Sequence, residues 1–156
     1  MTSRTDSRVE ELPADECWAL LRNEVVGRLG IAILNRPDIF PVNYVVDHGT
    51  IVLRTAEGTK FAAAVLGAAV AFEIDHYDAA KGQAWSVVAK GHAAEVEGMH
   101  ELFRMAELPL FPWHDAPKYR FVRIVPDELT GRRFFVDPTA LTARETYHSP
   151  ASAAIE

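Results

Sequence analysis

The sequence predicts a mainly β protein of the α+β class, in which six antiparallel strands form a small closed or split barrel with short helices in the gaps. One observation is that several segments alternate apolar with polar or small residues, as in the run AAVAFEI at 68–74. Another is that the connections have hairpin length and contain turn residues, as in DHGT at 47–50. A barrel is the economical arrangement of such strands because it hides their edges and buries one side of each.

The expected elements begin at Pro13, which starts a helix with acidic residues in its first turn. Cys17 and Leu21 share the apolar side of that helix, so the thiol is expected to be buried. Gly67 is expected to end a second helix, and Gly91 marks a bulge or close backbone approach in a long strand. We expect helices at 13–23, 58–67 and 98–108, a turn at 35–38, and strands at 26–34, 39–47, 50–56, 68–74, 84–97 and 119–135, the last as one or two strands.

The length of 156 residues fits one domain with a single hydrophobic core. We expect that domain at residues 11–137. The polar segment 1–10 is expected to be disordered, and residues 138–156 are expected to be a partly disordered extension.

The composition argues against several classes of protein. Lys plus Arg number 16 and Asp plus Glu number 22, so a net charge of −6 argues against nucleic acid as a partner. Cys17 is the only cysteine, which excludes an internal disulfide and a cysteine-rich zinc site. The apolar runs are shorter than the roughly 18 residues of a membrane span, and the N-terminus has no signal-peptide pattern. We therefore expect a cytoplasmic protein with no membrane partner.

Standard nucleotide-binding and catalytic motifs are absent from the sequence. It has no G-x-x-x-x-G-K-[ST], no G-x-G-x-x-G after a strand and no G-x-S-x-G around a serine. The six histidines form no H-x-x-x-H pair, so no metal site is expected.

A candidate anion site lies between the third expected strand and the following helix. Gly58 permits a sharp turn, and a helix starting near Thr59 leaves backbone N–H groups available to a ligand. Arg54 and Lys60 add positive charge, and Thr55 adds a hydroxyl. A phosphate monoester would satisfy all of these groups. On local spacing alone, an ordinary helix cap with two solvated basic side chains is the slightly favoured alternative.

Polar residues inside two apolar strands are further candidates. Asn43 and Tyr44 lie within FPVNYVV, where a buried amide needs a hydrogen-bond partner. Ser86 lies beside Trp85 at the start of another strand. The alternatives, a loop contact for Asn43 and a core position for Trp85, are at least as good for each residue alone.

Taken in order, the segments VGRLGIAI, PVNYVV, LRTAEGTK, VAFEID, AWSVVAKGHAAEV and VRIVPDELTGRRF resemble the pyridoxamine 5′-phosphate oxidase-related, FMN-binding split-barrel proteins. The resemblance covers roughly residues 13–135. It implies a six-stranded split barrel of that family and a homodimer with two equivalent flavin sites at its interface.

The resemblance also implies roles for the candidate residues. The FMN phosphate would lie against the third strand and the following helix start, and the isoalloxazine ring would run along a neighbouring strand whose main-chain groups meet its polar edge. Two further residues would approach from the partner subunit, and Trp113 is a weaker candidate for a wall of the site. The implied cofactor-binding residues are Pro41, Val42, Asn43, Tyr44, Arg54, Thr55, Gly58, Thr59, Lys60, Trp85, Ser86 and Trp113.

Two departures from the family pattern limit what the resemblance implies. The tail carries GRRFF instead of the Arg-x-His pattern that holds substrate in the pyridoxamine 5′-phosphate oxidases, so that oxidation is not expected. Lys90 and His92 stand where relatives often have two arginines, which leaves one charge dependent on pH.

Three hypotheses of function follow. The preferred one is an oxidoreductase that uses FMN, or the deazaflavin F420, to pass electrons to a small acceptor, with no catalytic side chain identified. The second is a non-catalytic protein of the same fold that binds flavin, F420 or haem, with His48, His76 or His92 as axial ligand. The third is a structural dimer whose basic turn is an ordinary helix cap.

Overall fold

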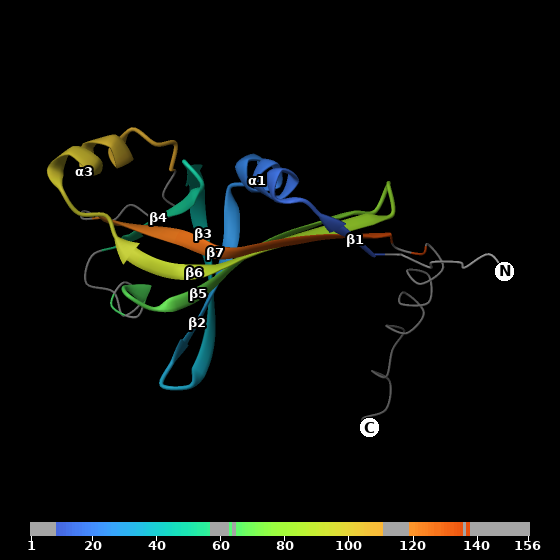
Figure 1. Cartoon of the computed structure of the whole chain (residues 1–156), viewed down its shortest axis with the longest axis horizontal. Helices are drawn as coiled ribbons and strands as arrows, with labels where there is room; N and C mark the ends of the chain where they lie inside the picture. Colours follow the sequence, from blue (N-terminus) through green and yellow to red (C-terminus); the bar gives the residue numbers. More distant parts are fainter. Residues whose placement is uncertain (1–8, 57–62, 64, 111–118, 136, 138–156) are drawn as a thin grey trace, which may run out of the picture.

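The computed structural model describes residues 9–56, 63, 65–110, 119–135 and 137. They form one twisted sheet, and both labelled helices lie above it in the view of Figure 1. In chain order the elements are β1 (Val9–Leu12), α1 (Ala14–Asn23), β2 (Val26–Ile33), β3 (Arg36–Asp47), β4 (Thr50–Ala56), β5 (Ala69–Asp78), β6 (Gln83–Glu95), α3 (Met99–Ala106) and β7 (Tyr119–Phe135). Most of the expected helix at 58–67 lies outside the described residues.

The sheet closes on itself and confirms the predicted split barrel. Its strand order is β1-β7-β4-β3-β2-β5-β6, and β6 also pairs with β7, so six strands form a ring. Every pairing is antiparallel. The strand count is seven instead of six, because β1 pairs with the distal part of β7 through Val9↔Phe134 to Leu12↔Gly131. Two of its residues, Val9 and Glu10, belong to the segment that was expected to be disordered. The strand was not predicted because four residues show too little alternation to be recognised.

The last expected segment forms one continuous strand, because its two halves pair with different neighbours. Residues 119–124 of β7 pair with β4, and residues 131–134 pair with β1, while β6 runs along the opposite edge. Pro126 is accommodated at a register shift between Lys90 and Gly91 of β6. A Cβ at Gly91 would collide with the backbone of Val125, which confirms the predicted close approach there.

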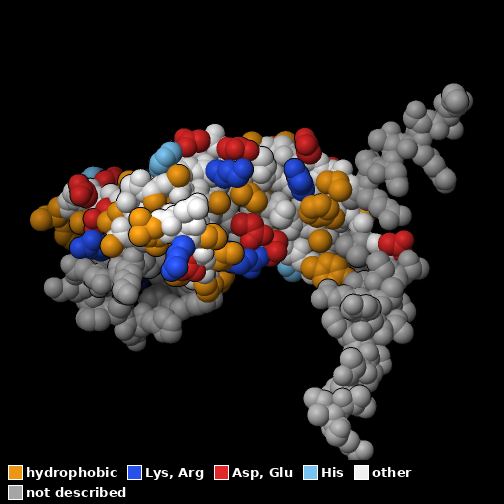
Figure 2. Space-filling view, turned by 90° about the horizontal axis from the view of Figure 1, so that it is seen from below, with side chains coloured by type: hydrophobic (Ala, Val, Ile, Leu, Met, Phe, Trp, Pro, Cys, Tyr) orange, Lys and Arg blue, Asp and Glu red, His pale blue; other side chains and the backbone are white. Residues whose placement is uncertain are grey.

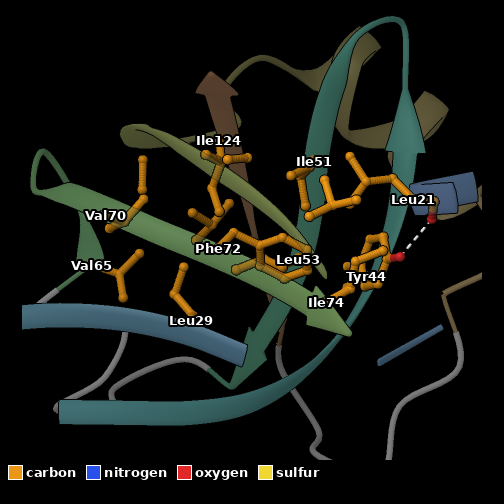
Figure 3. Close-up of a cluster of buried hydrophobic side chains, with 14 of the residues drawn as sticks. Leu21, Leu29, Tyr44, Ile51, Leu53, Val65, Val70, Phe72, Ile74 and Ile124 are labelled. Carbon is orange, nitrogen blue, oxygen red and sulfur yellow. Dashed lines mark hydrogen bonds between the residues drawn. The ribbon is translucent and has the colours of Figure 1, made fainter. Parts of the chain in front are cut away.

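The main core fills the inside of the ring. Tyr44, Ile51, Leu53, Phe72, Ile74 and Ile124 converge there from four strands (Figure 3). Helix α1 covers one end with Cys17 and Leu21, both fully buried as their helical spacing predicts. The hydroxyl of Tyr44 donates to the Leu21 carbonyl oxygen at 2.5 Å, which ties the helix to β3 (Figure 3).

A second apolar cluster lies on the outer face of the ring. Helix α3 and the turn after it cover Val52 and Phe121 with Met105 and Leu110, and Val96 completes the cluster. Among the described residues, no helix is long and apolar enough to cross a membrane.

A buried carboxylate attaches α3 to this outer face. Asp47, at the end of β3, is 6% exposed. It accepts two hydrogen bonds from Arg104 of α3, at 3.0 and 2.8 Å, and one from Arg123 of β7 at 3.0 Å. His48 Nδ1 lies 2.8 Å from Oδ1 of the carboxylate, the oxygen that also accepts from Arg104 Nη1. Hydrogen bonds from Arg104, followed by those from Arg123 and His48, hold the pKa of Asp47 well below its usual range.

We expect Asp47→Asn to lower the free energy of unfolding at pH 7 by about 3 kcal/mol, because it leaves two partly buried arginines without their anion. The native pKa of Asp47 is depressed, so its stabilisation is present above about pH 4 and is lost as the pH falls further. Urea denaturation of both proteins between pH 7 and pH 2.5 measures the difference, which should shrink on acidification. The matched control is Glu10→Gln, at an exposed ion pair with Arg133, which should change stability little.

We expect Tyr44→Phe to lower the free energy of unfolding by about 1–2 kcal/mol, because the Leu21 carbonyl loses its buried donor. Burial raises the pKa of this phenol above its ordinary value, so the hydroxyl stays protonated across the accessible pH range. Urea denaturation measures the loss. An unchanged stability would contradict the assignment of Tyr44 as the tie between α1 and β3.

Candidate functional site

The structure brings two of the predicted residues together on the outer face of β3 and β4. Tyr44↔Leu53 and Val45↔Val52 are paired, and Asn43 and Arg54 are the next residues beyond the last pair of this ladder. Side chains alternate across a strand, and Val45 and Val52 belong to the outer cluster, so Asn43 and Arg54 also point outward. The Arg54 Nε and the Asn43 Oδ1 are both buried atoms. A guanidinium and an amide therefore share one surface, where they can act on the same ligand.

Thr55 takes the opposite side of β4 from Arg54. It is buried, and its hydroxyl donates to the Arg120 carbonyl oxygen at 3.5 Å. Thr55 and Arg54 can thus meet one ligand only at the end of the strand, where the chain turns toward residues 57–62. The rest of the predicted phosphate turn, Gly58, Thr59 and Lys60, lies outside the described residues, as does Trp113.

The predicted ring-binding segment of β3 is divided between the two faces. Pro41 is exposed and points outward with Asn43, whereas Val42 packs against the main core. Tyr44 lies in that core, and its backbone N–H already donates to the Val25 carbonyl oxygen at 3.1 Å. Within this segment, the outward side chains of Pro41 and Asn43 are therefore the ones available to a ligand on this face.

Trp85 and Ser86 lie on β6, which is three strands away from β3 in either direction around the ring. Trp85 packs partly against the core and stacks beside His76, with ring centroids 5.9 Å apart. Ser86 pairs with Asp75 on one side and Arg132 on the other. Adjacent strands are about 4.8 Å apart, so three steps separate β6 from β3 by about 14 Å along the sheet. One chain does not bring Ser86 to the surface that Asn43 and Arg54 share.

The sequence reasoning missed the residues that border this surface. Phe121 stands across from Arg54 on β7, and Arg123 follows it beside Val52. The Asp47 cluster and α3 form the next layer along the same face. An acid at the end of one strand and an arginine in a distant strand carry no common motif, so only the ladder register reveals that they meet.

Lys90 and His92 lie elsewhere. Both are exposed on the outer face of β6, where Lys90 approaches Glu128 at 3.9 Å and His92 approaches Asp127 at 3.4 Å. Among the described residues, no group of three or more histidine, cysteine or acidic side chains could hold a metal ion.

Known proteins resemble this chain over most of its length. A structure of the FAD binding protein from Mycobacterium smegmatis is 39% identical, has a TM-score of 0.75, and is matched over 82% of this chain and 100% of its own. A Corynebacterium glutamicum crystal structure, described as a presumed pyridoxamine 5′-phosphate oxidase, is 40% identical with a TM-score of 0.76, over 83% of this chain and 95% of its own. An uncharacterized protein of Mycobacterium tuberculosis is 35% identical over 83% of this chain and 88% of its own length.

The family model of pyridoxamine 5′-phosphate oxidase matches residues 13–133, which include every strand of the ring. The paired residues of β3 and β4 and the glycine at the β6 bulge fall inside the matched range. One of the structures similar to this chain is that of a protein named for FAD binding. The predicted resemblance is confirmed, and the chain belongs to the pyridoxamine 5′-phosphate oxidase family.

Proposed function

We propose that this protein binds a flavin on the outer face of β3 and β4 and acts as a flavin-dependent oxidoreductase. The observation that carries the proposal is the placement of Arg54 and Asn43 on one surface, and Arg54 precedes the predicted phosphate-binding residues Gly58, Thr59 and Lys60 in the sequence. The similar Mycobacterium smegmatis protein is named as an FAD binding protein, and this supports a flavin as the ligand.

Arg54 is the described residue that suits the flavin phosphate. A guanidinium presents several donors in a fixed plane and binds phosphate oxygens through paired, charge-assisted hydrogen bonds. Lys60 and the backbone N–H groups near Thr59 would add charge and donors at the start of a helix. Such a set fits a terminal phosphate, which FMN carries, and it also suits the phosphates of FAD.

Asn43 and Pro41 are the side chains that would flank the ring on the same face. An amide can both donate and accept, so Asn43 can contact the polar edge of a heteroaromatic ring, and Pro41 offers an apolar surface beside it. Because a single chain keeps Ser86 and Trp85 away from this surface, their proposed contribution requires a second copy, and we propose a homodimer that shares each site.

The chemistry of the site would come from the cofactor. A bound flavin, or F420 in its place, supplies two-electron transfer between a reduced donor and an acceptor. Arg54 and Lys60 would hold and neutralise the phosphate, and the outer apolar cluster under helix α3 would exclude water from one border of the site. We do not assign pyridoxamine 5′-phosphate as the substrate, because the tail lacks the Arg-x-His pattern.

We expect Arg54→Met to weaken FMN binding at least about tenfold, because the phosphate loses a bidentate cation. Lys60→Met should have a similar effect. Isothermal titration calorimetry of the apo protein with FMN, FAD and riboflavin measures the change, and riboflavin should show little difference between wild type and variants because it has no phosphate. Lys81→Met, in the β5–β6 turn, is the matched control.

A wild-type protein that binds FMN with the affinity of riboflavin would contradict the phosphate assignment. Unchanged FMN affinity in both Arg54→Met and Lys60→Met would contradict it as well. Mass spectrometry of the copurifying small molecule identifies FMN, FAD or F420, and a Soret absorption band would identify haem.

We expect the flavin-loaded protein to turn over a reduced nicotinamide or reduced F420 with an artificial electron acceptor. Steady-state absorbance at the donor band measures this activity. A protein that retains its flavin but oxidises neither donor would be a carrier, which is the alternative within the same fold.

A further inference from the structure

The β2–β3 hairpin extends away from the ring (Figure 1). Its two strands pair with each other from Ile33↔Arg36 to Val26↔Asn43. Pairing of β2 with β5 covers only Arg28–Gly30, and pairing of β3 with β4 starts at Tyr44. In the described part of the chain, the outer part of the hairpin is therefore a two-stranded ribbon with no strand pairing along either outer edge. Edges of this kind are available for contact with another molecule.

The tip of this hairpin presents an apolar side chain in an unfavourable backbone conformation. Leu34 and Asn35 form the two-residue turn with φ angles of 49° and 62°. Asparagine and glycine are favoured at such positions, whereas a leucine with positive φ is rare. Leu34 is nevertheless 93% exposed, and Ile39 on the adjacent strand is 67% exposed. Both side chains would gain from an apolar contact that the single chain does not give them.

A groove of about 560 Å³ lies beside the hairpin on the outer face of the sheet. Gly30, Ala69 and Ala71 form its floor, because a glycine and two alanines project little above the sheet between the two walls. One wall is Ile39 with its neighbours on β3, and the other is formed by four titratable residues of β6 and β7: Lys90, His92, Asp127 and Glu128. The underside of the molecule, which includes the hairpin, mixes apolar with acidic and basic side chains (Figure 2).

The charges of the hairpin and of the groove are complementary. Arg36 is exposed beside the tip, and among the described residues it forms no ion pair. The groove wall carries Asp127 and Glu128, and within the described part of the chain their carboxylates form exposed ion pairs at 3.4 Å with His92 and at 3.9 Å with Lys90, respectively. An incoming arginine can join these acids without displacing a buried partner.

We propose that the hairpin tip of one copy of this chain docks into the groove of a second copy, with Leu34 against the groove floor and Arg36 near Asp127 and Glu128 of the wall. The tip and the groove lie on the same protomer, so a two-fold axis places each tip in the other groove at once. The contact buries the exposed side chains of Leu34 and Ile39, and it covers the unpaired edges of the hairpin. This surface deepens the proposed homodimer, and it is independent of the flavin.

We expect Leu34→Asn to raise the dimer dissociation constant at least about tenfold, because it removes the apolar contact. Asparagine is favoured at positive φ, so the turn itself should form at least as well, and circular dichroism should be unchanged. Sedimentation velocity at several concentrations, with the apo protein, measures the dissociation constant. Phe103→Asn, at a 69% exposed position on α3, is the matched control and should leave the dimer intact.

A charge exchange tests whether the contact is between chains. Arg36→Glu alone and Asp127→Arg with Glu128→Arg should each weaken the homodimer, more strongly at low salt. An equimolar mixture of the two variants should form heterodimers, which native mass spectrometry resolves. Heterodimers can form in this way only if residue 36 of one chain meets residues 127 and 128 of the other across the interface.

Three results would overturn the proposal. One is a Leu34→Asn variant that dimerises as tightly as the wild type, and another is a mixture of charge variants that forms no heterodimer. The third is a wild-type chain that is monomeric at micromolar concentration; if it also sediments with lipid vesicles, the tip contacts a membrane surface instead. Flavin titration of the same samples tests the cofactor site separately. If the Leu34→Asn variant binds flavin and dimerises as tightly as the wild type, the proposed interface is wrong but the cofactor site is not contradicted.

Discussion

The closed ring depends on strand β7, which is paired along both of its edges. Its first half joins β4 on one edge, its second half joins β1, and β6 accompanies it along the other edge. Without the β6–β7 pairing the sheet would be open, and the inward faces of β3, β4 and β5 would no longer enclose a common core. On its other edge, the pairing of β7 with β4 sets the register that places Phe121 across from Arg54. The closure of the barrel and the position of its candidate ligand surface therefore both depend on the pairing of β7.

The alternation of side chains in β3 and β4 then separates structural from functional roles. Tyr44 and Leu53 point inward and stabilise the core, while their neighbours Asn43 and Arg54 point outward. Asp47 extends the same division, because its carboxylate lies on the outer face and fixes α3 there through Arg104. A polar residue in such a strand is informative only when its face is known.

Much of the fold could be predicted from the sequence because its signals are local. Alternation located β5, strand-like segments between turn residues located β2, β3, β4 and β6, helical spacing located Cys17 and Leu21, and Gly91 marked the bulge. The observed turn, Leu34–Asn35, overlaps the expected turn at 35–38 only at Asn35, because residues 36–38 already belong to β3. Proline is tolerated there because this part of β3 has a strand partner on one edge. Strand β1 was not predictable, since four residues acquire their conformation from β7 and not from their own pattern.

The candidate site was predictable only in part. Asn43 was identified as a polar residue in an apolar strand and Arg54 as part of a basic segment around Gly58, and both lie just beyond the last pair of the β3–β4 ladder. Thr55 was grouped with Arg54 because adjacent residues look adjacent in a sequence, although a strand directs them to opposite faces. The Asp47, Arg104 and Arg123 cluster joins residues more than fifty positions apart in the chain, so no local pattern could reveal it.

The pairing of Val9 with Phe134 has a consequence for biosynthesis. During translation, β1 emerges first from the ribosome but has no strand to join until nearly the whole domain has been made. The ring likewise stays open until β7 is available, so β4 and β6 expose hydrogen-bonding edges on the nascent chain. Closure is thus a late, long-range event, and a chaperone that shields those edges would act in the interval before the last strand is released.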